Sequence, residues 1–259
     1  MFEQARNTDF TEAAFDIADS FRAVGPASAL LAVLIVMIYA VQWYWGATDI
    51  FLPLMGSTHP GTFSRGHVWT LASSTLVHAG LLHVGMNALF LLLVGSRVER
   101  VYGSWRMVVI FFVGALAGSV LSVALNPNQF GVGASGGAWA LMVAELISIV
   151  APKTRRGQPA LSTWQQALML VGLNVAVSFI PGVDAVAHVA GGLAGGLTIL
   201  VLYRLPTAAW ALAAVGLLVA HAVSVALALW MGQPWNGWPA LGPDVKHAFG
   251  ESGVVAVIP

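Results

Sequence analysis

The sequence predicts an all-α protein that crosses a membrane several times. Of its 259 residues, 58% are hydrophobic and only 8% are charged, whereas soluble domains carry roughly 25% charged residues. Such a composition leaves too few polar groups to cover a globular surface in water. The apolar residues also gather in seven stretches, each of about the 20 residues that a bilayer-spanning helix needs. We therefore predict a polytopic helical membrane protein.

The seven predicted spans follow one another along most of the chain. They run approximately over residues 27–45, 79–96, 106–126, 135–152, 164–181, 185–203 and 207–231. Most connections between the spans are short. The exception is the segment 46–78, which contains two prolines, several glycines and Trp69.

The basic residues predict the orientation of the chain, because cytoplasmic loops carry an excess of Lys and Arg. With the N-terminus in the cytoplasm, seven spans place the C-terminus outside, nine basic residues inside and two outside. We therefore expect a multi-pass protein of the cell membrane. The nine inner residues are Arg6, Arg22, Arg97, Arg100, Arg106, Lys153, Arg155, Arg156 and Arg204, and the outer ones are Arg65 and Lys246.

The two ends of the chain are predicted to be tails, 1–26 in the cytoplasm and 232–259 outside. The first tail is either a short amphipathic helix or a mobile segment. It lacks the basic region and short apolar core of a cleaved signal peptide. The absence of cysteine excludes disulfides, thiol catalysis and cysteine-based zinc sites.

Ser135 is the first candidate for chemistry. It lies in Gly133-Ala134-Ser135-Gly136, at the start of the fourth predicted span. A serine hydroxyl is a weak nucleophile until a base accepts its proton. Flanking glycines permit close backbone approach, and the free N–H groups at a helix start can stabilise an oxyanion. Serine beside glycine is also typical of helix packing in membranes, so this motif alone leaves both interpretations open.

His188, near the start of the sixth span, is a candidate base. Ionisable side chains within a span are costly and usually functional, and a neutral imidazole is the usual general base near physiological pH. Gly191 and Gly195 follow His188, with the small-xxx-small spacing that lets another helix approach closely. If that helix begins at Ser135, the hydroxyl and the imidazole come within hydrogen-bond reach. The alternative is a buried histidine with a structural role.

His83 and Asn87 form a third candidate group. Because four positions separate them, they share one face of a helix, and both can donate hydrogen bonds to an oxyanion. His78 lies about 140° away from His83 around a helix, which does not favour a joint metal site. A zinc site formed by His78, His83 and His188 stays open as an alternative, although the chain lacks the metalloprotease pattern of two histidines four residues apart. We predict no metal.

Three motifs and one loop occur in a fixed order along the chain. They are His78-x4-His83-x3-Asn87, Glu99-Arg100 before Gly103, Gly133-Ala134-Ser135-Gly136, and Ala187-His188-x2-Gly191-x3-Gly195. Together they resemble the motifs of the rhomboid intramembrane serine proteases. The resemblance implies a six-helix rhomboid-like catalytic core over residues 27–204. This chain then adds a seventh transmembrane helix, 205–231, at the C-terminal end of the core.

The resemblance also implies roles for individual residues. Ser135 matches the nucleophile and His188 the general base of a Ser–His dyad without a third acid. The side chains of His83 and Asn87, with the backbone N–H of Ser135, match the oxyanion-stabilising groups. Candidate supporting residues are His78, Gly133, Gly136 and Trp139, the last by stacking under the His188 ring or by filling space. The segment 46–78 resembles the family's first external loop, but Thr70 follows Trp69 where the family often has arginine.

Two other interpretations of residues near Ser135 and His188 compete with the Ser–His dyad. Asp184 precedes His188 by four residues and could orient its ring as the acid of a triad, but the resemblance favours a helix N-terminal role for it. The sequence from Gly133 to Gly137 fits the G-x-S-x-G elbow of α/β-hydrolases. That elbow needs a preceding strand, whereas Asn126-Pro127-Asn128 and a membrane span flank it here. A further alternative is a transporter with a polar site near the middle of the membrane. No inverted repeat or interrupted helix pair of the kind found in transporters is apparent.

The expected function is hydrolysis of peptide bonds in or next to transmembrane helices of other membrane proteins, within a lipid bilayer. No cofactor and no nucleic acid partner is implied, and the oligomeric state is unknown from the sequence. The alternative is an inactive rhomboid-like protein that binds or escorts membrane proteins. Such a protein would be expected to lose the serine or the histidine, and this chain keeps both.

Overall fold

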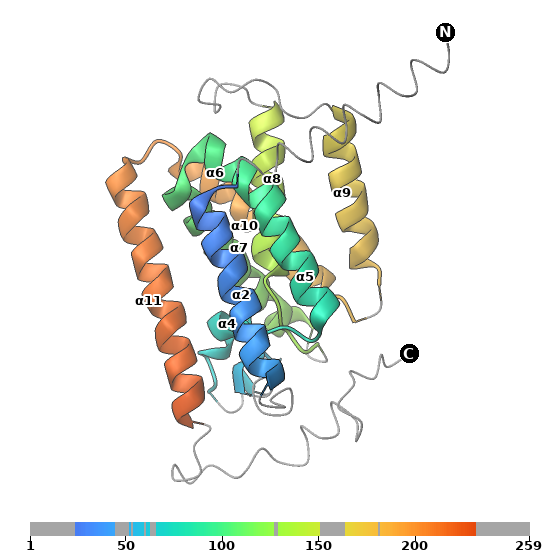
Figure 1. The fold of residues 1–259 in the computed structure, drawn as a ribbon, viewed down its shortest axis with the longest axis vertical. Helices are drawn as coiled ribbons and strands as arrows, with labels where there is room; N and C mark the ends of the chain where they lie inside the picture. The colour runs from blue at the N-terminus through green and yellow to red at the C-terminus, as the bar shows by residue number, and fades with distance from the viewer. Residues whose placement is uncertain are drawn as a thin grey trace.

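The described part of the chain is a bundle of helices that run roughly side by side (Figure 1). The computed structural model describes residues 24–44, 52, 54–59, 61–62, 66–126, 129–150, 164–180 and 182–231. Both predicted tails, apart from residues 24–26, lie outside the described residues, and so does the basic cluster at 153–156.

Helices occupy each of the seven predicted spans. The second span is divided into an α-helix, a π-helical turn and a second α-helix, and a short helix, α4, precedes it. The elements are α2 (Pro26–Tyr44), α4 (Thr70–Ser73), α5 (Leu81–Phe90), η2 (Leu91–Gly95), α6 (Ser96–Tyr102), α7 (Ser104–Leu125), α8 (Ser135–Val150), α9 (Trp164–Ser178), α10 (Ala185–Leu202) and α11 (Thr207–Met231).

Five helical segments of the described chain have at least 18 residues and are apolar enough to cross a membrane. They are Pro26–Tyr44, Leu81–Tyr102, Ser104–Leu125, Ala185–Leu202 and Thr207–Leu227. The helix that begins at Ser135 is also apolar but shorter. The predicted class, an all-α polytopic membrane protein, is confirmed.

The second span is longer than predicted. Its helical structure continues to Tyr102 instead of ending near residue 96, and one of the charged residues in the added part, Glu99, is held inside the protein. Glu99 is buried, and its carboxylate accepts hydrogen bonds from the backbone N–H groups of Ala27 and Ser28 at 3.0 and 2.9 Å. These N–H groups belong to the first turn of α2, where a carboxylate is electrostatically favoured. Gly103, with φ +90°, then turns the chain into α7.

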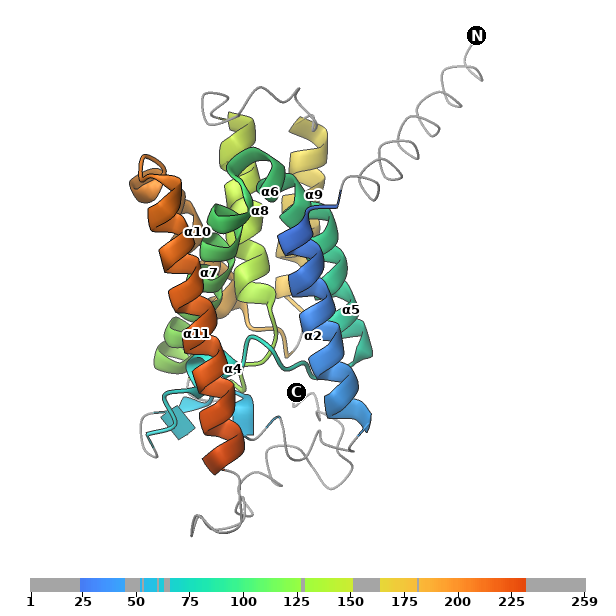
Figure 2. The same ribbon diagram turned by 60° about the vertical axis from the view of Figure 1, so that its left-hand side comes forward.

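Helices α7, α8 and α10 form the most closely packed group of the bundle (Figure 2). Glycines allow this approach. A Cβ on Gly114 of α7 would lie 2.2 Å from the Cβ of Ala140 on α8, and one on Gly118 would lie 2.8 Å from the carbonyl oxygen of Ala187 on α10. Large buried side chains fill the rest of the core, including Leu91, Met107, Ile110, Phe111, Phe112 and Leu141.

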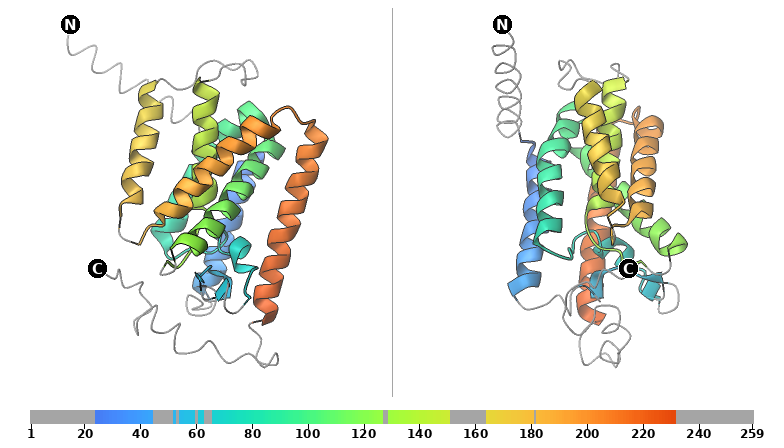
Figure 3. Two further views of the ribbon diagram at one scale, coloured as in Figure 1. Left: turned by 180° about the vertical axis from the view of Figure 1, so that it is seen from behind. Right: turned by 90° about the vertical axis from the view of Figure 1, so that its right-hand side faces the viewer.

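Helices α9 and α11 lie at opposite edges of the bundle (Figures 1 and 3). Helix α11, the additional C-terminal helix, packs against α7 and α4. Its Trp210 is buried, and the guanidinium of Arg106 lies 5.4 Å from the centre of that ring. The predicted seventh helix is thus an integral part of the packed structure.

Candidate active site

Ser135 is the first residue of α8, and the chain that leads to it is held by backbone hydrogen bonds. Gly131 forms an isolated antiparallel bridge with Ser57, with N···O distances of 2.8 and 2.9 Å. The N–H of Gly133 donates to the carbonyl of Ser74 at 2.8 Å. Gly133 has φ +106°, a conformation that residues with a side chain rarely adopt. These contacts anchor the loop before α8 to the segment between α2 and α5.

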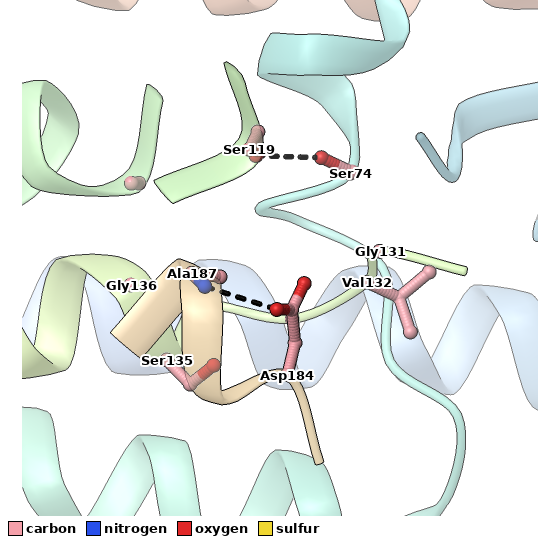
Figure 4. Close-up of a pocket in the computed structure, with 10 residues that line it drawn as sticks. Ser74, Ser119, Gly131, Val132, Ser135, Gly136, Asp184 and Ala187 are labelled. Carbon is pink, nitrogen blue, oxygen red and sulfur yellow. Dashed lines mark hydrogen bonds between the residues drawn. The ribbon is translucent and has the colours of Figure 1, made fainter. Parts of the chain in front are cut away.

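Asp184 and His188 lie in the first turns of α10. Asp184 is the N-cap residue of this helix, and its carboxylate accepts from the N–H of Ala187 at 2.9 Å. The same carboxylate accepts a hydrogen bond from the hydroxyl of Ser122 on α7. Figure 4 shows the Asp184 side chain directed toward Ala187. The predicted helix N-terminal role of Asp184 is confirmed.

The helix that begins at Ser135 meets the helix that carries His188, backbone against backbone. A Cβ on Gly191 would lie 2.2 Å from the carbonyl oxygen of Gly136, and one on Gly195 would lie 2.6 Å from the Cα of Ala140. The close approach predicted from the glycine spacing is confirmed. Ser135 lines one small pocket with Asp184 and Ala187 (Figure 4).

Trp139 stacks on the imidazole of His188. The two ring centroids are 5.3 Å apart and the planes differ by 19°. Trp139 lies one helical turn after Ser135 on α8, so the helix that presents the hydroxyl also supports the ring. His188 itself is buried, with 4% of its surface exposed.

The side chains of His83 and Asn87 lie against the loop before Ser135. A Cβ on Gly133 would lie 2.6 Å from Nε2 of His83 and 3.7 Å from Nδ2 of Asn87. The amide of Asn87 donates to the carbonyl of His83 at 3.1 Å, which holds it on the inner face of α5. Two hydrogen-bond donors are thus brought beside the Gly133–Ser135 backbone.

His78, in the segment before α5, contacts the loop that precedes Ser135. Its Nε2 accepts from the N–H of Ala134 at 3.4 Å. Burial, and secondly the nearby His83, lowers the pKa of His78 to about 3, so the ring is neutral and can act as an acceptor. Gln42 of α2 holds the His78 backbone by donating to its carbonyl at 2.8 Å and accepting from its N–H at 3.3 Å.

The three histidines weighed as zinc ligands do not form a metal site in the described chain. His78 and His83 pack edge to face, with 5.1 Å between their ring centroids. Within the described residues, no group of three or more His, Cys, Asp or Glu side chains is arranged to hold a metal ion.

The sequence did not point to Ser178, which contacts the same imidazole. The Ser178 hydroxyl lies 2.7 Å from Nδ1 of His188. Ser178 ends α9, and a serine at the end of an apolar helix has no distinguishing spacing pattern. Only the fold brings the end of α9 against the first turns of α10. Ser122, the partner of Asp184, was missed for the same reason.

Comparison with known proteins identifies the family to which these helices belong. The protein-family model of the rhomboid domain matches residues 65–205, which are more than half of the chain. RHOMBOID-like protein 4 of Arabidopsis thaliana is 31% identical over 166 residues, which are 64% of this chain and 42% of that protein. Rhomboid-like protease 3 of Toxoplasma gondii is 30% identical over 146 residues, 56% of this chain and 55% of that protein.

A further relative carries a different description. Inactive rhomboid-related protein 2 of Caenorhabditis elegans is 28% identical over 170 residues, 62% of this chain and 47% of that protein. The chain spans about half of the length of these relatives.

The matched domain covers the helices that carry His83, Ser135 and His188. The chain belongs to the rhomboid family.

Proposed function

We propose that this protein is an intramembrane serine endopeptidase that hydrolyses peptide bonds in or next to transmembrane helices of other membrane proteins. The observation that carries the proposal is the contact between the backbones of α8 and α10 at Gly136 and Gly191. This contact brings the start of the Ser135 helix against the helix that carries His188.

In the proposed reaction, Nε2 of His188 accepts the proton of the Ser135 hydroxyl while the serine oxygen attacks the scissile carbonyl. The N–H of Ser135 and the side chains of His83 and Asn87 stabilise the oxyanion. His188 then donates its proton to the leaving amine, and water hydrolyses the acyl-enzyme. Because the carbonyls of a membrane helix are already hydrogen-bonded, the substrate must unwind locally before attack.

Cleavage of a transmembrane substrate in proteoliposomes tests the proposal. Ser135→Ala and His188→Ala should abolish cleavage, and a fluorophosphonate should label the parent but not Ser135→Ala. Loss of the His83 or Asn87 side chain should lower turnover by about 10- to 1,000-fold. If the alanine variants of the dyad cleave as fast as the parent, the assignment of Ser135 and His188 is wrong.

The second candidate function is that of an inactive rhomboid-like protein that binds membrane proteins. The name of the Caenorhabditis elegans relative suggests this candidate. Fluorophosphonate labelling separates the two. An activated serine reacts covalently whether or not the right substrate is present, whereas a binding protein leaves Ser135 unlabelled.

We place the active site toward the outer face of the cell membrane, on the strength of the distribution of basic residues. The chain contains no cysteine, so single cysteines can report its orientation. Val68, 62% exposed, precedes α4, and Trp105, 43% exposed, follows α6 at the start of α7. Helices α4 and α6 lie toward opposite ends of the bundle (Figure 1). A membrane-impermeant maleimide should label Val68→Cys in intact cells and Trp105→Cys only after permeabilisation. The reverse pattern would invert the orientation, and no labelling in intact cells would place the protein in an internal membrane.

A further inference from the structure

The Nδ1 atom of His188 has a defined partner on a third helix. The Ser178 hydroxyl oxygen lies 2.7 Å from this nitrogen and 3.0 Å from the carbonyl oxygen of Asn174, one turn earlier on α9. Ser178 and His188 are both at least partly buried. The base therefore contacts α9 through Nδ1, in addition to the indole of Trp139 on α8.

The number of protons available determines the direction of these two hydrogen bonds. A serine hydroxyl has one proton to donate and can accept through its lone pairs. The carbonyl of Asn174 can only accept, so the Ser178 proton must point to it if that bond is made. The bond to His188 then requires that Nδ1 carries a proton and donates it to Ser178. Both contacts are satisfied together only in this arrangement.

The arrangement has a direct consequence for the other ring nitrogen. In a neutral imidazole one nitrogen is the donor and the other the acceptor. With the proton held on Nδ1 by Ser178, the lone pair lies on Nε2, the nitrogen that has to accept the Ser135 proton. Partners at the second nitrogen set the tautomer of functional histidines in this way.

Asp184 does not provide this function. Its carboxylate accepts from Ser122 and from the N–H of Ala187, so it caps α10 and is engaged away from Nδ1. Ser178 therefore occupies the position that an acid occupies in a Ser-His-Asp triad, without adding a charge to the apolar interior. A neutral acceptor avoids the cost of a buried unpaired carboxylate.

We propose that Ser178 is a positioning residue that selects the Nδ1-protonated tautomer of His188 and fixes the orientation of its ring. The proposal rests on the proposed function only in that His188 is taken as the base. Once Ser135 has transferred its proton, the imidazole carries protons on both nitrogens. The Ser178 oxygen, whose own proton points to Asn174, continues to accept from Nδ1.

The test is a matched pair of variants, Ser178→Thr and Ser178→Val, which have nearly the same shape and differ by a hydroxyl. Threonine can also bond to the carbonyl four residues earlier. Ser178→Thr should keep turnover within about 3-fold of the parent. Ser178→Val should lower kcat by about 5- to 150-fold, the effect of one lost buried hydrogen bond, with KM unchanged. Ser178→Ala, which adds no branched carbon, should behave like Ser178→Val.

The tautomer is measured directly, and without any turnover, by ¹⁵N NMR of histidine-labelled protein in micelles. The His188 signals are assigned by their absence from His188→Gln. The parent and Ser178→Thr should have a protonated Nδ1 and an unprotonated Nε2, and Ser178→Val and Ser178→Ala should have a changed distribution.

The two proposals fail in different ways. A parent protein that shows the Nδ1-protonated tautomer, altered in Ser178→Val, but that neither cleaves nor reacts with a fluorophosphonate overturns the proposed function and supports the role of Ser178. A parent that cleaves while its His188 is protonated on Nε2 overturns the inference. Equal turnover and equal tautomer signals in the folded Thr, Val and Ala variants overturn it as well.

Discussion

The indole of Trp139 and the imidazole of His188 lie face to face, 5.3 Å apart with 19° between their planes. One comes from α8, four residues after Ser135, and the other from α10. The stack is a second contact between the helix of the proposed nucleophile and the helix of the proposed base, in addition to the glycine contact between them. It restricts the His188 ring to one plane, while Ser178 holds the Nδ1 edge of that ring.

Removal of the stacked ring should slow catalysis moderately. An aromatic pair contributes about 0.5–1.5 kcal/mol beyond its buried area, so Trp139→Leu should lower kcat by about 2- to 12-fold if that support acts in the transition state. Trp139→Phe keeps a ring and should retain most of the activity. The measurement is cleavage of one substrate by both variants in proteoliposomes. Equal rates for Trp139→Leu and the parent would mean that the indole only fills space.

Substitution of Asp184 should distinguish a dyad from a triad. Asparagine caps a helix about as well as aspartate, so Asp184→Asn should fold normally and keep turnover near the parent value. In a Ser-His-Asp triad, the same change lowers kcat by about 10⁴-fold. Asp184→Ala loses the cap and should cost about 0.5–2 kcal/mol of stability. A loss of several thousand-fold in a folded Asp184→Asn protein would restore Asp184 as the third member.

A methyl group at the contact between α8 and α10 should force the two helices apart. In Gly191→Ala the new Cβ would lie 2.2 Å from the carbonyl oxygen of Gly136, and a backbone oxygen cannot move aside independently of its helix. We expect a loss of about 1–3 kcal/mol or more, read as a lower melting temperature in detergent, together with reduced turnover.

The matched control for Gly191 is Gly216 in the middle of α11. A Cβ there would meet no heavy atom within 4 Å, and alanine is the better helix residue by about 0.5–1 kcal/mol. Gly216→Ala should therefore melt at the parent temperature or slightly above it. If Gly191→Ala and Gly216→Ala melt alike and turn over alike, the close helix contact is not required.

Neutralisation of Glu99 should destabilise the junction between α2 and α6. Its carboxylate is 5% exposed and accepts from Ala27 N, Ser28 N, Ser28 Oγ and Ser104 Oγ at 2.6–3.0 Å. The amide of Glu99→Gln would turn a donor toward a backbone N–H that cannot reverse. The expected cost is about 1.5–3 kcal/mol, the range for a hydrogen bond to a charged group.

Thermal unfolding in detergent measures this cost. Ser104→Ala removes one of the four donors and leaves the carboxylate in place, so it should lower the melting temperature by less than Glu99→Gln does. The prediction fails if Glu99→Gln melts at the parent temperature, or if Ser104→Ala has the larger effect.

Much of the site was predictable from local sequence. The apolar stretches predict the helices because the bilayer core requires every backbone group to be bonded within a helix. The glycine spacing after His188 predicts the close packing of α10, since small side chains alone permit it. The position of Asp184 at the start of that helix predicts its capping role, which depends on neighbours three residues away.

Other contacts depended on the path of the whole chain. The second span extends beyond its predicted end because Glu99 is bonded by α2, more than 70 residues earlier in the sequence. The spacing of apolar residues gives no information about a hydrogen-bond partner so far away in the sequence. A run of charged residues by itself predicts exposure to water. Ser178 and Ser122 likewise look like ordinary small polar residues in apolar helices until the bundle places them beside His188 and Asp184.

The sequence by itself therefore determined the membrane class, the order of the helices and the identity of the serine and histidine that are proposed to react. The tertiary structure decided how the imidazole is held, by Trp139 on one face and Ser178 at Nδ1. The physical reason is that helix formation and small-residue packing are encoded by neighbours along the chain. The partner of a single ring nitrogen is encoded only by which helices meet and at what depth.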